Sequence, residues 1–152
     1  MSVLKGYAGK IAYIDLTEQK VRVEELAEET ARKYLGGKGL GAYLLYRHLR
    51  PGIDPYDPDN VLIFISGPLT GTAFPCSGRC AVVTKSPMTE TFLDSYAGGS
   101  FGPCLKYAGY DGLVITGKAK SPVYIFVDND EIFIKEAGHL WGMTTIEAEK
   151  HL

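Results

Sequence analysis

The sequence has few cysteines, no long apolar run and no excess of positive charge. Its three cysteines are an odd number, which favours reduced thiols over a disulfide framework. The longest apolar run, Val61–Ile65, is far shorter than the roughly 20 residues that a membrane helix needs, and the start of the sequence lacks the apolar core of a signal peptide. Sixteen basic against eighteen acidic side chains leave no positive surplus for a nucleic-acid backbone. We therefore expect a cytoplasmic protein with neither a membrane nor a nucleic-acid partner.

The common catalytic motifs are also missing. No two histidines have the HxxxH or HExxH spacing of metal ligands on one helix face; they are His48, His139 and His151. Cys76 and Cys80 are neither a CxxC redox pair nor part of an iron–sulfur run, and Cys104 lies further on. The GxSxG elbow of hydrolases and the GxxxxGKS/T loop of nucleoside triphosphatases are absent. We therefore expect no catalytic side chain in residues 1–152, and we look to the backbone for chemistry.

What is present is the composition of one globular domain. Of 152 residues, 45% are hydrophobic and 22% are charged, and a chain of this length buries roughly 68–70% of the surface exposed when unfolded. Alternating and helical apolar patterns predict an α+β order. The expected strands are Lys10–Leu16, Lys20–Glu25, Val61–Ser66, Arg79–Lys85, Thr91–Ser95, Gly112–Thr116, Val123–Val127 and Glu131–Lys135. The expected helices are Ala27–Leu35, Gly39–Leu49, Phe101–Ala108 and Thr144–Leu152, and the Gly36-Gly37 pair suits the C-cap of the first.

A weak internal repeat is visible in this order. The hairpin Lys10–Glu25 and the helix Ala27–Leu35 resemble the hairpin Val123–Lys135 and the helix Thr144–Leu152 in order, length and pattern. The last helix begins with a capping-box sequence, TTIE, but no glycine cap or proline ends it. The sequence therefore predicts a duplicated α+β domain with antiparallel and mixed sheets, the second unit being truncated. The alternative is that a hairpin followed by a helix is a common local order.

Glycine is over-represented, at 18 of 152 residues against an average of about 7%. Many of the glycines fall in three loops, Gly67–Thr72, Ser77–Arg79 and Ala97–Gly102. Glycine lets backbone N–H groups approach an anion, and the helix after the third loop would add a partial positive charge. Because the guanidinium of Arg79 can grip phosphate through two hydrogen bonds, this pattern indicates an anion site. The alternative is that the glycines only form turns and that Arg79 forms a structural ion pair.

The order of individual residues identifies a protein family more specifically than the spacing of motifs does. The segment GPLTGTAFPCSGRCAVVTKSPMTETFLDSYAGGSFGPCLKYAGYDGLVITGKA (67–119) resembles the amino-terminal domain of the aldehyde ferredoxin oxidoreductase family. The likeness extends to YLGGKGLGAYLLY, PVYIFV and HLWG, and so covers essentially residues 1–152. Members of this family hold tungsten, or sometimes molybdenum, between two pterins. The resemblance implies that residues 1–152 form a duplicated β–α–β base on which the bis-pterin cofactor lies, with part of that domain missing.

The resemblance also implies four site residues. Arg79 matches the family arginine that contacts the pterin phosphate region. Tyr96 stands where members often have asparagine, whose backbone carbonyl helps to hold a magnesium ion that bridges the pterin phosphates. Gly98 and Gly99 match the glycine pair that lets the backbone meet the cofactor. Since any residue supplies a carbonyl, Tyr96 keeps that contact available, although a side-chain role is in doubt.

The family features that are missing define the expected role of the chain. The cysteines of the family's 4Fe–4S cluster and the acid–base groups of its later domains are absent. The resemblance implies a parent enzyme that oxidises aldehydes to carboxylic acids and passes electrons through the cluster to ferredoxin. Its partners would be the carboxy-terminal domains of the same enzyme, and a homo-oligomer is compatible with it. Two alternatives are a separate small subunit or assembly module without its own active site, and a structural domain whose glycines only make turns.

Overall fold

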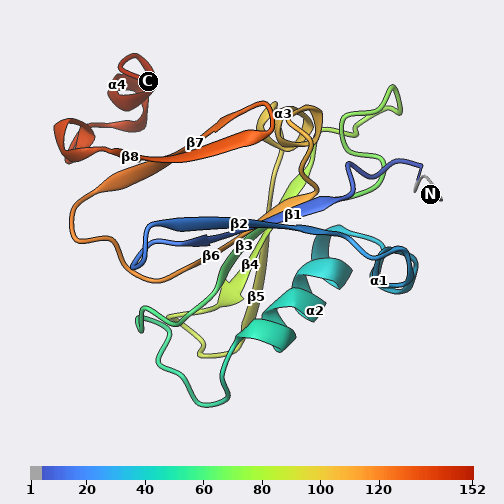
Figure 1. The fold of residues 1–152 in the computed structure, drawn as a ribbon, viewed down its shortest axis with the longest axis horizontal. Coiled ribbons are helices and arrows are strands. Elements are labelled where there is room, and N and C mark those ends of the chain that lie inside the picture. Colours follow the sequence, from blue (N-terminus) through green and yellow to red (C-terminus); the bar gives the residue numbers. More distant parts are fainter. Residues whose placement is uncertain (1–4) are drawn as a thin grey trace.

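The structure is a computed structural model that describes residues 5–152, in which eight strands and four α-helices follow one another (Figure 1). The strands are β1 (Lys10–Asp15), β2 (Lys20–Glu25), β3 (Leu62–Ser66), β4 (Cys80–Lys85), β5 (Phe92–Ala97), β6 (Gly112–Thr116), β7 (Val123–Asp128) and β8 (Glu131–Glu136). The helices are α1 (Glu28–Tyr34), α2 (Gly37–His48), α3 (Phe101–Tyr107) and α4 (Thr145–Glu149), with a 3₁₀ turn at Gly138–Leu140. Every strand and helix expected from the sequence is present.

Six strands form one mixed sheet. Their order is β2-β1-β6-β3-β4-β5, in which β1 and β6 are parallel and all other neighbours are antiparallel. Strands β7 and β8 pair only with each other among the described residues. The predicted α+β class with mixed sheets is confirmed. Both hairpins precede a helix, as the repeat predicted, but the first lies within the large sheet and the second stands apart from it.

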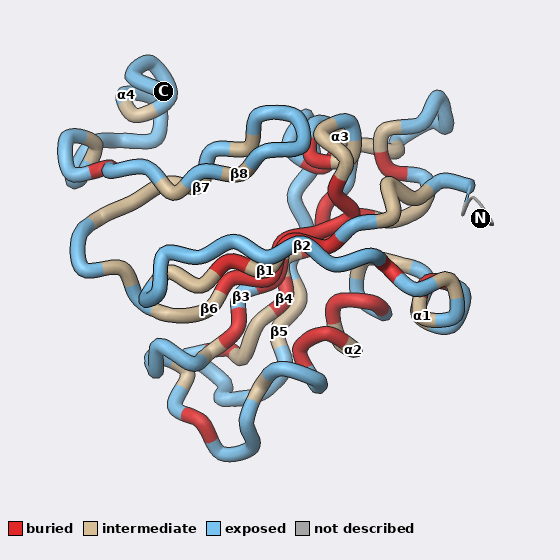
Figure 2. The backbone as a smooth tube through the Cα atoms, in the orientation of Figure 1, coloured by how far each residue is buried: buried red, intermediate tan, exposed pale blue. Residues whose placement is uncertain are grey.

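The molecule has three layers, with the six-stranded sheet in the middle and a cover on each of its faces (Figure 1). Helices α1 and α2 cover one face, where their apolar residues pack on alternate residues of β1, β3, β4 and β6. Helix α3 and the β7–β8 hairpin cover the other face, where the buried Tyr110 donates a hydrogen bond to the carbonyl of Asp130 over 2.5 Å. The buried residues follow the central strands and α2, whereas the β7–β8 hairpin is partly buried and α4 is mostly exposed (Figure 2). The core is therefore formed by the sheet and its two covers.

The turn between α1 and α2 differs from the expected glycine C-cap. Leu35 is the C-cap of α1 and itself has a positive φ of 60°, while Gly36 is extended and Gly37 already begins α2. Gly36 is required for another reason, since a Cβ there would lie 2.7 Å from the carbonyl oxygen of Ser66. The glycine pair thus allows α2 to begin directly against the end of β3.

Two further details compare with the sequence expectations. Strand β5 runs two residues beyond the expected end, to Ala97, because Tyr96 and Ala97 pair with the start of β4. The capping box of the last helix is confirmed, because Thr144 Oγ1 accepts a hydrogen bond from the backbone N–H of Glu147, whose carboxylate accepts one from the N–H of Thr144. No helix in residues 5–152 is long and apolar enough to cross a membrane.

A buried ion pair joins the amino-terminal segment to the sheet and α3. Lys106 Nζ lies 3.1 Å from Asp111 Oδ1, and only 8% and 2% of the two side chains are exposed. The same carboxylate accepts hydrogen bonds from the backbone N–H groups of Ala8 (3.0 Å) and Gly9 (2.7 Å). Lys106 also donates to the carbonyl of Gly6. Both charges are therefore paired and hydrogen-bonded, as buried charges must be.

The same two residues connect neighbouring parts of the sheet with the first glycine loop. Lys106 Nζ donates to the carbonyl oxygen of Gly67 over 3.3 Å. The backbone N–H of Asp111 donates to Lys10, and its carbonyl accepts from Ser66, each over 2.8 Å. The start of β1, the end of β3, the start of β6 and the last turn of α3 are thus held together at one point.

We predict that Lys106→Met lowers the free energy of unfolding by about 3–5 kcal/mol, because the Asp111 carboxylate would remain buried without its counter-charge. Urea unfolding measures this change. The matched control is Lys20→Met, since Lys20 pairs with Glu18 at the exposed tip of the first hairpin; its effect should stay within about 1 kcal/mol. Equal effects of the two substitutions would contradict the structural role of the buried pair.

Candidate functional site

The first two glycine loops meet at the end of β3 and the start of β4, and Thr70 joins them. The buried Thr70 hydroxyl accepts a hydrogen bond from the N–H of Gly67 (3.1 Å) and donates one to the carbonyl of Arg79 (3.0 Å). A backbone hydrogen bond from Gly71 N–H to the carbonyl of Ser77 adds a second connection over 3.2 Å. The two loops are therefore fixed relative to each other.

The third loop packs against the other two. A Cβ placed on Gly78 would lie 3.0 Å from the carbonyl oxygen of Gly99, so the second and third loops nearly touch. A Cβ on Gly102 would lie 3.2 Å from both Cys80 Cβ and Thr70 Cγ2. The structure thus brings together the three loops that the sequence singled out, and two of their glycines are needed for the close approach.

The groups facing outward from these loops are unpaired. The exposed Arg79 side chain makes no hydrogen bond or ion pair with any of residues 5–152. None of the described residues accepts a hydrogen bond from the backbone N–H groups of Gly98, Gly99 or Ser100. No heavy atom lies within 4 Å of a Cβ placed on Gly98 or Gly99, and Gly99 has a φ of +100°. A guanidinium and several free N–H groups beside open space fit a group with several negatively charged oxygens.

Helix α3 contributes less to this surface than the sequence suggested. It has seven residues, and Ser100 at its N-cap makes no side-chain capping bond. Because the helix dipole comes from aligned peptide units, so short a helix adds little to the positive potential. The positive character of this surface therefore comes mainly from the Arg79 guanidinium and the loop N–H groups.

Tyr96 lies at the end of β5, directly opposite Ala81 of β4. Ala81 belongs to the apolar cluster beneath α2, so Tyr96 is on the α2 face of the sheet. Partial burial, followed by a hydrogen bond with Asp94, raises the pKa of the Tyr96 hydroxyl. Tyr96 is about half exposed, and only Ala97 separates its backbone from the glycine pair.

The cysteines do not form a metal site here. All three are free thiols, as predicted, and burial raises the pKa of Cys80. Among residues 5–152 no group of three or more His, Cys, Asp or Glu side chains could hold a metal ion. Any cation at this surface would therefore need backbone carbonyls or a ligand's own oxygens.

Sequence reasoning missed three residues that build the site: Thr70, Lys106 and Asp111. Lys106 and Asp111 act on residues 39 and 103 positions away, whereas Thr70 bonds residues only 3 and 9 positions away. The only available signal was a threonine inside GPLTGT, which is also common in ordinary turns.

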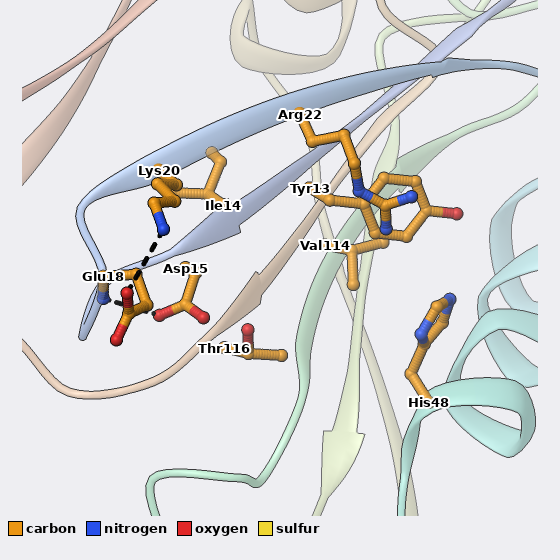
Figure 3. A pocket seen from close by; sticks show the side chains of 9 residues that line it. All are labelled: Tyr13, Ile14, Asp15, Glu18, Lys20, Arg22, His48, Val114 and Thr116. Carbon is orange, nitrogen blue, oxygen red and sulfur yellow. Dashed lines mark hydrogen bonds and ion pairs between the residues drawn. The ribbon is translucent and has the colours of Figure 1, made fainter.

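A separate hollow of about 420 Å³ lies at the opposite end of β1 and β6 (Figure 3). Tyr13, Arg22 and His48 line it, and burial together with the nearby arginines lowers the pKa of His48. Its charges are already balanced, since Lys20 pairs with Glu18 and Arg22 pairs with a glutamate of its own strand. This hollow offers no net charge for a polyanion, and the glycine loops remain the stronger candidate.

An unpaired arginine and free backbone N–H groups at the end of a sheet are chemically suited to an anionic group. Residues 11–152 match the family model described as "Aldehyde ferredoxin oxidoreductase, N-terminal domain". The chain therefore belongs to the aldehyde ferredoxin oxidoreductase family, as the sequence resemblance indicated.

Several known proteins are similar to this chain. It is 44% identical to the tungsten-containing aldehyde ferredoxin oxidoreductase of Pyrococcus abyssi over 97% of its length, and 46% identical to that of Pyrococcus furiosus over 95%. It is 43% identical to the "Aliphatic sulfonate oxidoreductase, WOR-like subunit" of Pyrococcus furiosus over 97%. In each comparison the chain spans 24% of the relative.

A solved structure has the same fold. In the active-site complex BamBC of benzoyl coenzyme A reductase, one chain superposes with a TM-score of 0.94 at 35% identity, over 97% of this chain and 22% of that one. The chain thus spans 22–24% of these longer relatives.

We predict that Thr70→Val lowers the free energy of unfolding by about 1–3 kcal/mol, because the N–H of Gly67 and the carbonyl of Arg79 lose their shared partner. Chemical denaturation gives the value. Thr72→Val is the control, because the exposed Thr72 hydroxyl bonds within its own loop, to Leu69 and Phe74. If both variants lose the same stability, Thr70 does not hold the loops together.

Proposed function

We propose that this chain is the amino-terminal domain of an enzyme that oxidises aldehydes to carboxylic acids, and that its glycine loops bind a tungsten or molybdenum bis-pterin. Such a cofactor supplies the metal that carries out the two-electron oxidation. The family membership and the tungsten-containing relatives support the oxidoreductase class. The observation that carries the cofactor proposal is the unpaired Arg79 beside free N–H groups.

Arg79 is proposed to bind the pterin phosphates. Its backbone is fixed, because Thr70 holds its carbonyl and Cys80 begins β4 directly after it. Its guanidinium has no competing acidic partner among residues 5–152. A fixed backbone with a free guanidinium is suited to two parallel hydrogen bonds to one phosphate.

Gly98 and Gly99 are proposed to let the cofactor lie against the backbone. Their open surroundings leave room for a ligand at the points where side chains would project. The positive φ of Gly99 turns the chain there, a conformation that glycine adopts without steric cost. The free N–H groups of this turn would then donate to phosphate oxygens.

Tyr96 is proposed to supply its backbone carbonyl to a magnesium ion bridging the two pterin phosphates. Magnesium prefers hard oxygen ligands and keeps several from water or phosphate, so one carbonyl is a suitable protein contribution. Only Ala97 lies between Tyr96 and Gly98, so the Tyr96 carbonyl is close in sequence to the glycine pair.

The remaining functions would belong to other parts of the enzyme. The 4Fe–4S cluster and the substrate groups are proposed to lie in carboxy-terminal domains, with ferredoxin as the electron acceptor. The free thiols support a cytoplasmic location. A homo-oligomer is compatible with this proposal. This chain would orient the cofactor and neutralise its phosphates.

The similarity to an aliphatic sulfonate oxidoreductase subunit favours a second candidate for the substrate. Purified protein assayed with a panel of aldehydes and of aliphatic sulfonates separates the two. If the protein reduces an electron acceptor when given aldehydes but not when given aliphatic sulfonates, the result supports the first proposal.

An alternative is that the chain is a separate small subunit or assembly module. An antibody against residues 5–152 distinguishes the two forms in cell extract. A band near 16.6 kDa would indicate the separate subunit, whereas a band about four times larger would match the length of the relatives.

We predict that Arg79→Ala, in the protein in which this chain occurs, weakens retention of metal and pterin about tenfold or more, because a charge-assisted hydrogen bond is lost. Elemental analysis and pterin fluorescence after dialysis measure both components. Arg50→Ala is the control, since Arg50 is an exposed arginine that pairs with Asp59. Unchanged metal and pterin in Arg79→Ala would support the purely structural interpretation of the glycine loops.

We predict that Tyr96→Phe keeps the magnesium content of the isolated protein unchanged, because the substitution preserves the backbone carbonyl. Elemental analysis of magnesium relative to tungsten or molybdenum provides the measurement. Loss of magnesium in this variant would show that the hydroxyl is involved.

A further inference from the structure

Strand β5 carries Tyr96 and leads directly into the glycine pair, yet it is an edge strand. Within the six-stranded sheet it pairs only with β4, and it ends at Ala97, directly before the glycine pair. The position of its last residues therefore depends on one neighbouring strand and on contacts from the helical layer.

Lys38, in the first turn of α2, provides a contact from that layer. Its Nζ lies 3.0 Å from Asp94 Oδ1 and 5.6 Å from the centre of the Phe92 ring. Asp94 and Tyr96 are next but one to each other on β5, and the Asp94 carboxylate contributes to the raised pKa of the Tyr96 hydroxyl. Residues 92, 94 and 96 alternate along β5, so all three side chains are on the face that α2 covers.

The pair is ionised at neutral pH. The hydrogen bond from Lys38 is the main cause that lowers the pKa of Asp94, and the same bond raises the pKa of Lys38. The contact is therefore lost only when acid protonates Asp94 below its already lowered pKa, or when alkali neutralises Lys38 above its raised one.

The backbone that carries Lys38 is itself placed against the site. A Cβ on the nearby Gly36 would lie 2.7 Å from the Ser66 carbonyl oxygen and 2.8 Å from Gly67 Cα. The following Gly37 has a φ of +48°, which turns the chain into α2. The start of α2 thus lies against the first glycine loop. From there the Lys38 side chain reaches β5, the strand that leads into the third loop.

We infer that Lys38 is a positioning residue for the cofactor-binding end of β5, acting through Asp94 on the segment from Tyr96 to Gly99. This inference rests on the proposed function, since it assigns a role at the same surface. Lys38 connects two layers of the fold, whereas the ion pairs of Lys20 and Arg32 stay within one hairpin and one helix. Only 19% of the Asp94 side chain is exposed, so this connection is sheltered on one side.

The test compares Lys38→Met with Lys38→Arg, which keeps the charge, in the protein in which this chain occurs. Lys20→Met is the matched control at an exposed ion pair. Hydrogen–deuterium exchange of the peptide covering residues 93–100, on cofactor-free protein, reports the position of β5. Tungsten or molybdenum electron paramagnetic resonance and steady-state kinetics, on loaded protein, report its effect on the cofactor.

In Lys38→Met we expect exchange in residues 93–100 to rise about threefold or more, with the rest of the protein unchanged. The metal spectrum should shift, and kcat should fall about three- to tenfold with KM within twofold, because a misplaced cofactor slows the reaction without removing substrate binding. Lys38→Arg should restore all three readouts, and Lys20→Met should change none of them.

Unchanged exchange in Lys38→Met would overturn the inference, and so would raised exchange with an unchanged metal spectrum and kcat. Wild-type protein that contains neither tungsten nor molybdenum would contradict the proposed function instead. In that case raised exchange would still show that Lys38 positions β5, and the absence of any cofactor would overturn its assignment to a cofactor surface.

Discussion

The buried pair of Lys106 and Asp111 is the constraint on which the arrangement of this domain depends. It satisfies backbone groups from the amino-terminal segment, the first glycine loop and the strand ends at a single point. Because each charge would be costly to bury alone, the amino-terminal segment, the first glycine loop and the strand ends must assemble around the pair together. The glycine loops, which we propose to bind an anion, therefore rest on a fixed base.

The candidate site divides its polar groups into two kinds. Those facing inward, such as the Thr70 hydroxyl and the carbonyl of Arg79, are satisfied within the domain. Those facing outward, the Arg79 guanidinium and the N–H groups of the third loop, have no protein partner among the described residues. Internal satisfaction fixes the loops before a ligand arrives, which reduces the ordering cost of binding. The same division explains why glycine is abundant here: it permits close packing on one side and open backbone on the other.

Local patterns were sufficient to predict every strand and helix, because alternation, helical spacing and the capping box are written in neighbouring residues. The glycine loops were also identified, and their three segments do meet. What the sequence could not reveal were contacts between distant residues. Nothing near Lys106 in the sequence indicates that its partners include Gly67. Likewise, the positive φ of Leu35 lies beside Gly36, whose close approach to the end of β3 cannot be read from neighbouring residues. The roles of Arg79, Tyr96 and the glycine pair toward a cofactor stay predictions.

The parallel pairing of β1 with β6 has a consequence for how the domain is made. β1 lies near the start of the chain, but its partner is among residues 112–116, and Asp111 bonds Ala8 across 103 positions. During synthesis the nascent chain must hold β1 without that neighbour until most of the domain has left the ribosome. Such non-local pairing is slow to form. The glycine loops are translated before β6 and acquire their base only afterwards, so the surface that they form is complete only once β6 has joined the sheet.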